Sequence, residues 1–303
     1  MFIVINSNKS SILLSTYSQK LADEIMDKNI INSIIPNAKL SISSNSHVDF
    51  QINHLKSNKN EVKLFKKRLD IRSKTDDALT GFQIGFILQA IFEKLYQETN
   101  SYGIHAAAIC KNEKCILLMG DAYSGKSSLA LRLCKENNFE FVGDERCIIQ
   151  YNKKLRVLSG NSLLVLRKDF LSKNYSYLKL DNRTNLGNAR IFVNSTDLKL
   201  KLNKKPVTIN AIIRVNIGKL TKTTILSQFD STLLLFRALT YQIRSINTPL
   251  VNFDYVLPSL DNQKLSEKRL KMSKKVSESV PTFEIHGSQK YIQNEINKIF
   301  RLL

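Results

Sequence analysis

Cysteine is scarce in this chain of 303 residues, and its four positions fit neither a metal site nor a disulfide framework. Cys110, Cys115, Cys134 and Cys147 have no CxxC spacing and no nearby pair of histidines. Metal binding through these thiols and disulfide formation are therefore not expected. Free thiols are typical of a reducing compartment, so we expect a cytoplasmic protein.

Long apolar runs are also missing. The best candidate, residues 81–96, is short and contains Gln83, Gln89, Glu93 and Lys94. A helix that crosses a bilayer needs about 20 mainly apolar residues, so no membrane association is expected. The first fifteen residues lack the basic segment and the small-residue cleavage site of a secretory signal, and none is predicted.

Internal repeats, low-complexity tracts and linkers rich in proline and glycine are absent, so the composition marks no sharp domain boundary. Residues 1–100 alternate like short strands and end in a helical pattern over 79–96. We predict an α/β protein with a β-rich N-terminal region over 1–100 and a core over 101–303. The N-terminal region carries no evident chemistry and is expected to shape an acceptor site or to mediate assembly, which leaves a homo-oligomer open.

Basic residues outnumber acidic ones, and the formal net charge is +20. Such a charge is compatible with nucleic acid, an anionic membrane or an acidic partner. However, lysine accompanies many asparagine and isoleucine residues, and no basic stripe with interleaved aromatic residues is present. A compositional origin of the charge is therefore favoured over nucleic-acid binding, while an acidic peptide or a phosphorylated substrate stays compatible with it.

The most informative stretch is residues 120–127, which fit the Walker A pattern GxxxxGK[ST] of a P-loop. An apolar run over 115–119 precedes it, and residues 128–133 follow with helical character. Strand, loop and helix therefore occur in the required order, which favours nucleotide binding over the alternative of an ordinary turn. The predicted nucleotide-binding residues are Gly120, Asp121, Ala122, Tyr123, Ser124, Gly125, Lys126, Ser127 and Ser128.

Each residue type in the loop suits phosphate chemistry. Glycine lets the backbone turn its N–H groups toward oxyanions, and the following helix adds its positive dipole end. Lys126 can reach the β- and γ-phosphates of ATP, and the Ser127 hydroxyl can bind Mg²⁺.

Two further features lie near this loop in the sequence. His105 precedes Gly120 by fifteen residues, and for an isolated histidine the ordinary interpretation is a cap on a strand. Residues 139–142 are predicted to form a strand that ends at Asp144 and Glu145. A carboxylate pair beside a phosphate loop can hold Mg²⁺ and accept a proton from an attacking hydroxyl, whereas the alternative is a polar turn.

Together these three features resemble the HPr serine kinases and their HPr-kinase-like relatives. The similarity is carried by Ile104-His105-Ala106, by residues 120–127 and by Val142-Gly143-Asp144-Glu145, within roughly 101–151. It implies a P-loop kinase core with the phosphoenolpyruvate-carboxykinase-like fold. The sequence around His105 is nearer to the kinase-like relatives, some of which modify peptides or small molecules.

The resemblance also implies roles for individual residues. Asp144 is implied as the general base, Glu145 as a metal-associated partner, and His105 as a residue near the transferred phosphoryl group that supports Asp144. The loop itself adds Lys126 to the catalytic residues and Ser127 to the metal-associated ones. Glu145 stands where the HPr enzymes usually have aspartate. A C-terminal loop rich in glycine and arginine, which accompanies phosphatase action in the family, is not found, so kinase activity without the reverse reaction is expected.

The chain after residue 150 adds fewer candidates. Arg183 and Arg190, in the polar segment 181–190, are candidates for a cation that contacts the phosphate or the acceptor, against the alternative of ordinary surface arginines. Asp230 and Ser231 are expected to cap a helix over 232–244.

The sequence therefore predicts an ATP- and Mg²⁺-dependent phosphotransferase whose acceptor is a hydroxyl, most simply a serine of a peptide or protein. One alternative is a kinase for a free amino acid or sugar. The other is a module that binds nucleotide or an anionic polymer without catalysis.

Overall fold

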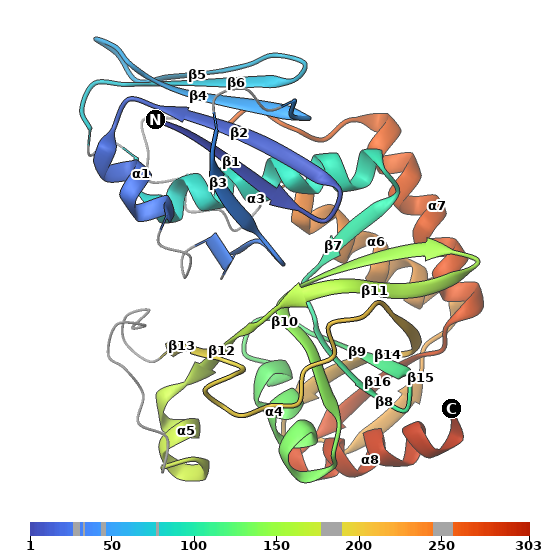
Figure 1. Cartoon of the computed structure of the whole chain (residues 1–303). Helices are drawn as coiled ribbons and strands as arrows, with labels where there is room; N and C mark the ends of the chain where they lie inside the picture. The colour runs from blue at the N-terminus through green and yellow to red at the C-terminus, as the bar shows by residue number, and fades with distance from the viewer. Residues whose placement is uncertain (27–30, 33, 44–46, 77–78, 177–189, 245–256) are drawn as a thin grey trace. The chain divides into compact units, whose positions relative to one another are not determined.

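The computed structural model describes most of the chain (Figure 1). The residues that it describes are 1–26, 31–32, 34–43, 47–76, 79–176, 190–244 and 257–303. They form a mixed α/β structure, which confirms the predicted class. The chain divides into two compact units, of which the first comprises Met1–Tyr102 with Leu239–Lys268 and the second Gly103–Ala238 with Arg269–Leu303.

The first unit contains a six-stranded sheet in the order β3-β1-β2-β4-β6-β5. The β1–β2 hairpin and the β5–β6 pair are antiparallel, whereas β2, β4 and β6 run parallel. Its strands are β1 (Phe2–Ser7), β2 (Ser10–Thr16), β3 (Lys39–Ile42), β4 (Phe50–Lys56), β5 (Glu61–Leu64) and β6 (Arg68–Ser73).

Two helices pack on this sheet, α1 (Gln19–Met26) and α3 (Gly81–Glu98), and they contact each other and β2. The predicted helix over 79–96 is therefore confirmed as α3. It begins after Thr80 with a capping box, in which Gln83 Oε1 accepts the Thr80 backbone N–H at 2.6 Å. At its other end the Tyr96 hydroxyl donates to Ser7 at 2.6 Å, which ties the helix to the sheet.

The second unit is built on a larger sheet in the order β11-β10-β8-β9-β14-β16-β15, with β7 beside β10. The centre is parallel, since β14 pairs in parallel with both β9 and β16. The strands are β7 (Ser101–Ile104), β8 (Ala107–Lys111), β9 (Lys114–Met119), β10 (Glu140–Asn152), β11 (Lys154–Asn161), β14 (Val207–Ile217), β15 (Lys222–Ile225) and β16 (Thr282–Gly287).

Five helices and a small hairpin complete the described elements after β9. The hairpin pairs β12 (Leu163–Arg167) with β13 (Arg190–Asn194). The helices are α4 (Lys126–Glu136), α5 (Lys168–Asn174), α6 (Gln228–Arg244), α7 (Gln263–Ser279) and α8 (Gln289–Leu302). The sequence ranges of β7, α6 and α7 extend across the division between the units.

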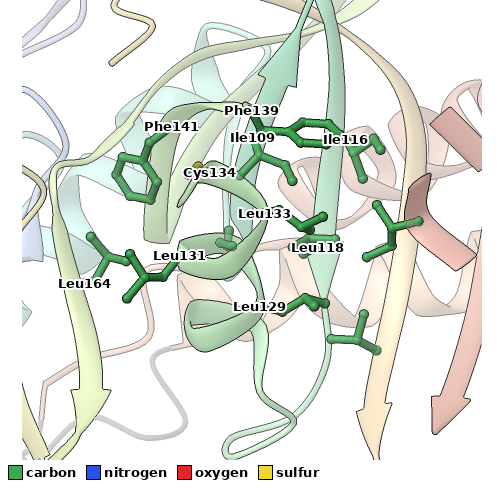
Figure 2. Close-up of a cluster of buried hydrophobic side chains, with 14 of the residues drawn as sticks. Ile109, Ile116, Leu118, Leu129, Leu131, Leu133, Cys134, Phe139, Phe141 and Leu164 are labelled. Carbon is green, nitrogen blue, oxygen red and sulfur yellow. The ribbon is translucent and has the colours of Figure 1, made fainter. Parts of the chain in front are cut away.

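The core of the second unit surrounds α4. Leu131 points toward Leu164 of β12, and Leu133 toward Leu118 of β9 (Figure 2). The same cluster contains Ile292 and Ile296 of α8. Because each fully buried leucine or isoleucine stabilises the fold by roughly 1.5–3 kcal/mol, this core holds the first turn of α4 in a defined place on the sheet.

Two sequence predictions about element boundaries are wrong. The strand over 139–142 does not end at the acidic pair, because β10 continues through it to Asn152 across a β-bulge. Helix α6 begins at Gln228 and not after Ser231. Its first turn is capped by Ser227, whose hydroxyl oxygen accepts the Asp230 N–H at 3.1 Å, and not by the Asp230-Ser231 pair.

The division of the chain into 1–100 and 101–303 stays a prediction about domains. Among the described residues, no helix combines the length and the hydropathy that crossing a membrane requires.

Candidate functional site

The predicted phosphate loop connects the end of β9 to the start of α4. Two glycines are required by its geometry. Gly120 has φ of 151°, and a Cβ there would lie 2.6 Å from the backbone oxygen of Val215. Gly125 has φ of 90° in the left-handed region and is the N-cap of α4. The strand, the loop and the helix follow in the predicted order because these glycines allow a tight reversal that a residue with a side chain would strain.

Lys126 is the first residue of α4 and is 5% exposed. Its Nζ donates hydrogen bonds to the carbonyl oxygens of Gly120 and Asp121, both at 3.0 Å. A buried ammonium requires such partners, and here they come from the loop itself. The lysine side chain therefore binds the backbone of the loop that precedes it. It lies at the N-terminal end of α4, where the peptide dipoles favour an anion.

The acidic pair lies in a distorted part of β10. Asp144 is opposite Asn161 and Cys147 is opposite Gly160, so β10 holds additional residues between these two pairs. The left-handed backbone of Glu145, with φ of 59°, accommodates these additional residues of β10. Beside the bulge, Gly143 and Gly160 bring β10 and β11 so close that a Cβ on Gly143 would lie 2.4 Å from Gly160 Cα. Bulges of this kind redirect side chains, and here the two acids face different surroundings.

Asp144 is fully buried, and neither of its carboxylate oxygens has a hydrogen-bond partner. Burial, followed by repulsion from Glu145, raises the pKa of Asp144 to about 7. The Ser127 hydroxyl and the Glu145 backbone N–H, which lie nearby without the full geometry of a hydrogen bond, and the Lys126 ammonium oppose this rise. An isolated buried carboxylate is costly, so this position suits a ligand that brings positive charge.

Glu145 and His105 lie together at the edge of a cavity. His105 Nε2 is 3.8 Å from Glu145 Oε2, and the two side chains are 41% and 32% exposed. Partial burial, and then the charge of Lys126, lower the pKa of His105, so the imidazole is neutral at pH 7. The contact is therefore that of a neutral ring beside a carboxyl group, and not an ion pair.

The cavity has a volume of about 440 Å³, within the range of small-molecule sites. The loop and the first turn of α4 form one part of its lining, together with His105 and Glu145. Another part comes from the end of β12 and from α5, which contribute Phe170, Lys173 and Asn174. Asn174 accepts a hydrogen bond from Arg132 Nη2 of α4 at 2.6 Å, which connects the two helices.

The α5 residues were missed by sequence reasoning. Helix α5 is only seven residues long, too short for a periodic signal, and no motif marks it. Arg167, which precedes it and also lines the cavity, donates two hydrogen bonds to Asp169, at 2.9 and 2.8 Å. Its charge is therefore already matched.

The structure brings together most of the predicted site residues, which stay candidates for a function. Those that line the cavity are His105, Ala122, Tyr123, Gly125, Lys126, Ser127, Ser128 and Glu145. Asp144 is buried and is not part of the lining. The exposed Asp121 lies near Arg214 of β14, whose Nη2 is 3.7 Å from Asp121 Oδ2.

Two of the predicted cations, Arg183 and Arg190, have side chains outside the described part of the chain. Arg183 lies outside the described residues. The backbone of Arg190 pairs with Arg167 at the start of β13, and its side chain lies outside the description.

The residues present fit a magnesium ion that arrives with a nucleotide. Within the described part of the chain, no three His, Cys, Asp or Glu side chains come together to bind a metal ion by themselves. Mg²⁺ commonly uses only one or two carboxylates and takes its other ligands from phosphates and water. The unpartnered oxygens of Asp144, close to the Ser127 hydroxyl, supply a donor set of this kind.

No protein-family model and no curated protein matches the chain. Among solved structures, the HPr(Ser) kinase/phosphatase from Coxiella burnetii is similar over 65% of this chain and 97% of that one, with 12% sequence identity and a TM-score of 0.30. A TM-score of this size does not establish a common fold. What can be inferred about function therefore depends on the geometry of the cavity.

Proposed function

We propose that the second unit binds ATP with Mg²⁺ and transfers the γ-phosphoryl group to a hydroxyl, most simply a serine of a peptide or protein. One observation carries this proposal. Lys126, at the start of α4, and Asp144 are both buried beside one cavity, and no hydrogen bond of full geometry reaches the Asp144 carboxylate. Phosphate binding explains the lysine, and a cation bound to that phosphate explains the carboxylate.

The residues of the loop would bind the triphosphate first. Lys126 exchanges its two carbonyl partners for phosphate oxygens, and the N–H groups at the start of α4 point toward the same anion. Ser127 and one of the two acids Asp144 and Glu145 would hold Mg²⁺, which neutralises charge on the phosphates. The side chains of α5, with Phe170 and Asn174, would bound the space that the rest of the nucleotide or the acceptor fills.

The acceptor hydroxyl must lose its proton as the new bond to phosphorus forms. The carboxyl groups of Asp144 and Glu145 are the candidates for this role, and the sequence resemblance favours Asp144. Positioning and charge neutralisation supply most of the rate in phosphoryl transfer, so a single base contributes only part of it. An acidic peptide acceptor is compatible with the net charge of +20, and Arg183 and Arg190 stay proposed cations for the phosphate or the acceptor.

Replacing Lys126 tests the proposal. Lys126→Ala should abolish detectable nucleotide binding and lower transfer from [γ-³²P]ATP by about 10³-fold or more, since it removes both the charge and the loop contact. Lys135→Ala, in the last turn of the same helix, is the control and should leave both unchanged. The measurements are equilibrium binding of labelled ATP and the appearance of label on protein, peptide or a dialysable product.

The destination of the label separates the alternatives. Label on a dialysable product indicates a small-molecule kinase. Tight ATP binding by the unmodified protein with no transfer to any acceptor contradicts the proposed reaction and indicates a non-catalytic nucleotide-binding module.

A further inference from the structure

The two adjacent acids of β10 are not equivalent in the structure, and the difference assigns them separate tasks. We infer, on the basis of the proposed function, that Glu145 receives the proton of the acceptor hydroxyl, with His105 as its positioning partner. Asp144 instead faces the cation together with Ser127. This reverses the roles that the sequence resemblance implies for the pair.

Access to the cavity favours Glu145 over Asp144 for the proton transfer. A general base must come within about 2.6–3.2 Å of the group that it deprotonates, directly or through one water. Asp144 is 0% exposed, both of its oxygens are buried, and it does not line the cavity. The close approach of Gly143 to Gly160 holds the backbone beside it, since not even a methyl group fits between the strands there.

Glu145 has the access that Asp144 lacks. The left-handed backbone at Glu145, inside the bulge, sends its side chain to the cavity lining, where it is 32% exposed. A non-glycine residue in this conformation is uncommon and usually costs stability, and such strain gathers at functional sites. In an uninterrupted strand, adjacent side chains alternate between faces, and the bulge changes which face each acid meets.

His105 is placed to orient Glu145. Its Nε2 lies 3.8 Å from Glu145 Oε2, and both side chains line the cavity. A neutral imidazole beside the carboxylate can limit its rotation without neutralising it. A small movement would bring the two atoms within hydrogen-bond distance when an acceptor fills the cavity, and catalytic hydrogen bonds often tighten in this way on binding.

The environment of Asp144 suits a cation better than a proton acceptor. Its neighbours include Glu145 and His105 and also the Ser127 hydroxyl and the Lys126 ammonium. The last two are the groups that contact magnesium and phosphate in loops of this pattern. Neither of its buried oxygens makes a hydrogen bond of full geometry that a cation would have to displace.

In the proposed step, the acceptor oxygen forms a bond to the γ-phosphorus while the bond from that phosphorus to the β,γ-bridging oxygen breaks. The acceptor proton passes to a Glu145 carboxylate oxygen, and ADP leaves with the electron pair of the broken bond. Because Glu145 is open to solvent, its proton then returns to water, which restores the carboxylate.

Two variants measured in two ways test this assignment. Glu145→Gln should lower kcat by about 10²-fold or more while KM for ATP stays within about twofold. Asp144→Asn should weaken the binding of Mn²⁺ to the protein with a non-hydrolysable ATP analogue by about tenfold or more, measured by electron paramagnetic resonance. In this binding measurement, Glu145→Gln should match the unmodified protein. Glu113→Gln, in the exposed turn between β8 and β9, is the control for both measurements.

Chemical rescue distinguishes a base from a residue that only supports the structure. Formate should restore at least about tenfold of the lost turnover to Glu145→Ala and none to Asp144→Ala. His105→Asn should lower kcat. Formate should rescue the double variant His105→Asn/Glu145→Ala less than it rescues Glu145→Ala alone, because the added formate then lacks the imidazole ring that orients it.

The assignment is overturned if Glu145→Gln retains normal kcat, or if Asp144→Asn binds Mn²⁺ normally while losing turnover. Failure of the proposed function has a different signature, since the unmodified protein then transfers no phosphoryl group at all. That result removes the role of Glu145 as well, whereas the Mn²⁺ titration still decides the role of Asp144.

Discussion

The two units treat their buried polar groups differently. In the first unit, no buried side-chain nitrogen or oxygen of a described residue lacks a hydrogen bond. His54, 1% exposed, lies between Thr16 and Ser73, with 2.9 Å from each ring nitrogen to a hydroxyl oxygen. In the second unit, both oxygens of the buried Asp144 lack a partner, as does the Ser124 hydroxyl in the loop. Ser195 Oγ and Ser273 Oγ, which do not line the cavity, also lack one.

The unpartnered groups of the second unit include two residues of the predicted site. Satisfying a buried polar atom is the ordinary outcome of folding, because leaving one without a partner costs about 1–3 kcal/mol. The first unit meets that condition for His54, whereas the second leaves a carboxylate and a hydroxyl next to a cavity. Under the proposed function, a ligand that brings phosphate and a cation would give these two groups partners.

The largest expected effect concerns the backbone contact beside the acids. Gly143→Ala should destabilise the protein by about 3 kcal/mol, because the new methyl group meets the Gly160 backbone at 2.4 Å and neither strand can move freely. The midpoint of urea unfolding measures this change. Gly218→Ala is the matched control: a Cβ there contacts nothing within 4 Å, and stability should change by less than about 0.5 kcal/mol. Equal effects of the two variants would show that the strands are not tightly apposed.

Asp144 should make the protein less stable at higher pH. Folding raises the pKa of Asp144 to about 7, so the folded chain retains a proton that the unfolded chain loses near pH 4. The free energy of unfolding therefore falls as pH rises from about 4 to about 7, by an amount on the order of 3 kcal/mol. Asp144→Asn should remove this dependence and be more stable than the unmodified protein at pH 8 in EDTA. If the free energy of unfolding of the two proteins changed with pH in the same way, the raised pKa of Asp144 would be contradicted.

His54 should produce the opposite dependence in the first unit, with a somewhat smaller magnitude. Burial lowers the pKa of His54 to about 4, whereas the nearby charge of Asp76 opposes the shift. As the pH decreases, His54 of the unfolded chain therefore binds a proton before His54 of the folded chain does. The free energy of unfolding falls by roughly 2–3 kcal/mol between about pH 6.5 and about pH 4. Thermal unfolding at pH 7 and pH 4.5 measures it. His54→Gln should show a smaller difference between the two pH values, and His47→Gln, at an exposed position, should behave as the unmodified protein.

Much of the local structure around the loop could be predicted from the sequence. Asn112 and Glu113 both have positive φ in the two-residue turn between β8 and β9, as expected for a tight hairpin. The order of β9, loop and α4 followed from an apolar run, two glycines and a helical pattern. These signals are local, since each depends on residues within one turn or one strand.

Other features could not be predicted in this way. The bulge in β10 depends on the pairing of Asp144 with Asn161 and of Cys147 with Gly160, seventeen and thirteen residues away in the chain. The contribution of α5 to the cavity depends on packing between helices that no motif records. Long-range pairing of this kind leaves no periodic trace in either segment alone.

The sequence by itself determined that a lysine follows a glycine at the start of a helix and that two acids stand side by side further along. Only the tertiary structure decided that Asp144 is buried while Glu145 lines a cavity with His105. The reason is physical: backbone conformation over a few residues depends on local sterics. The burial of a side chain depends instead on which distant strand pairs with its own, and in this protein β11 determines which of the two carboxylates meets solvent.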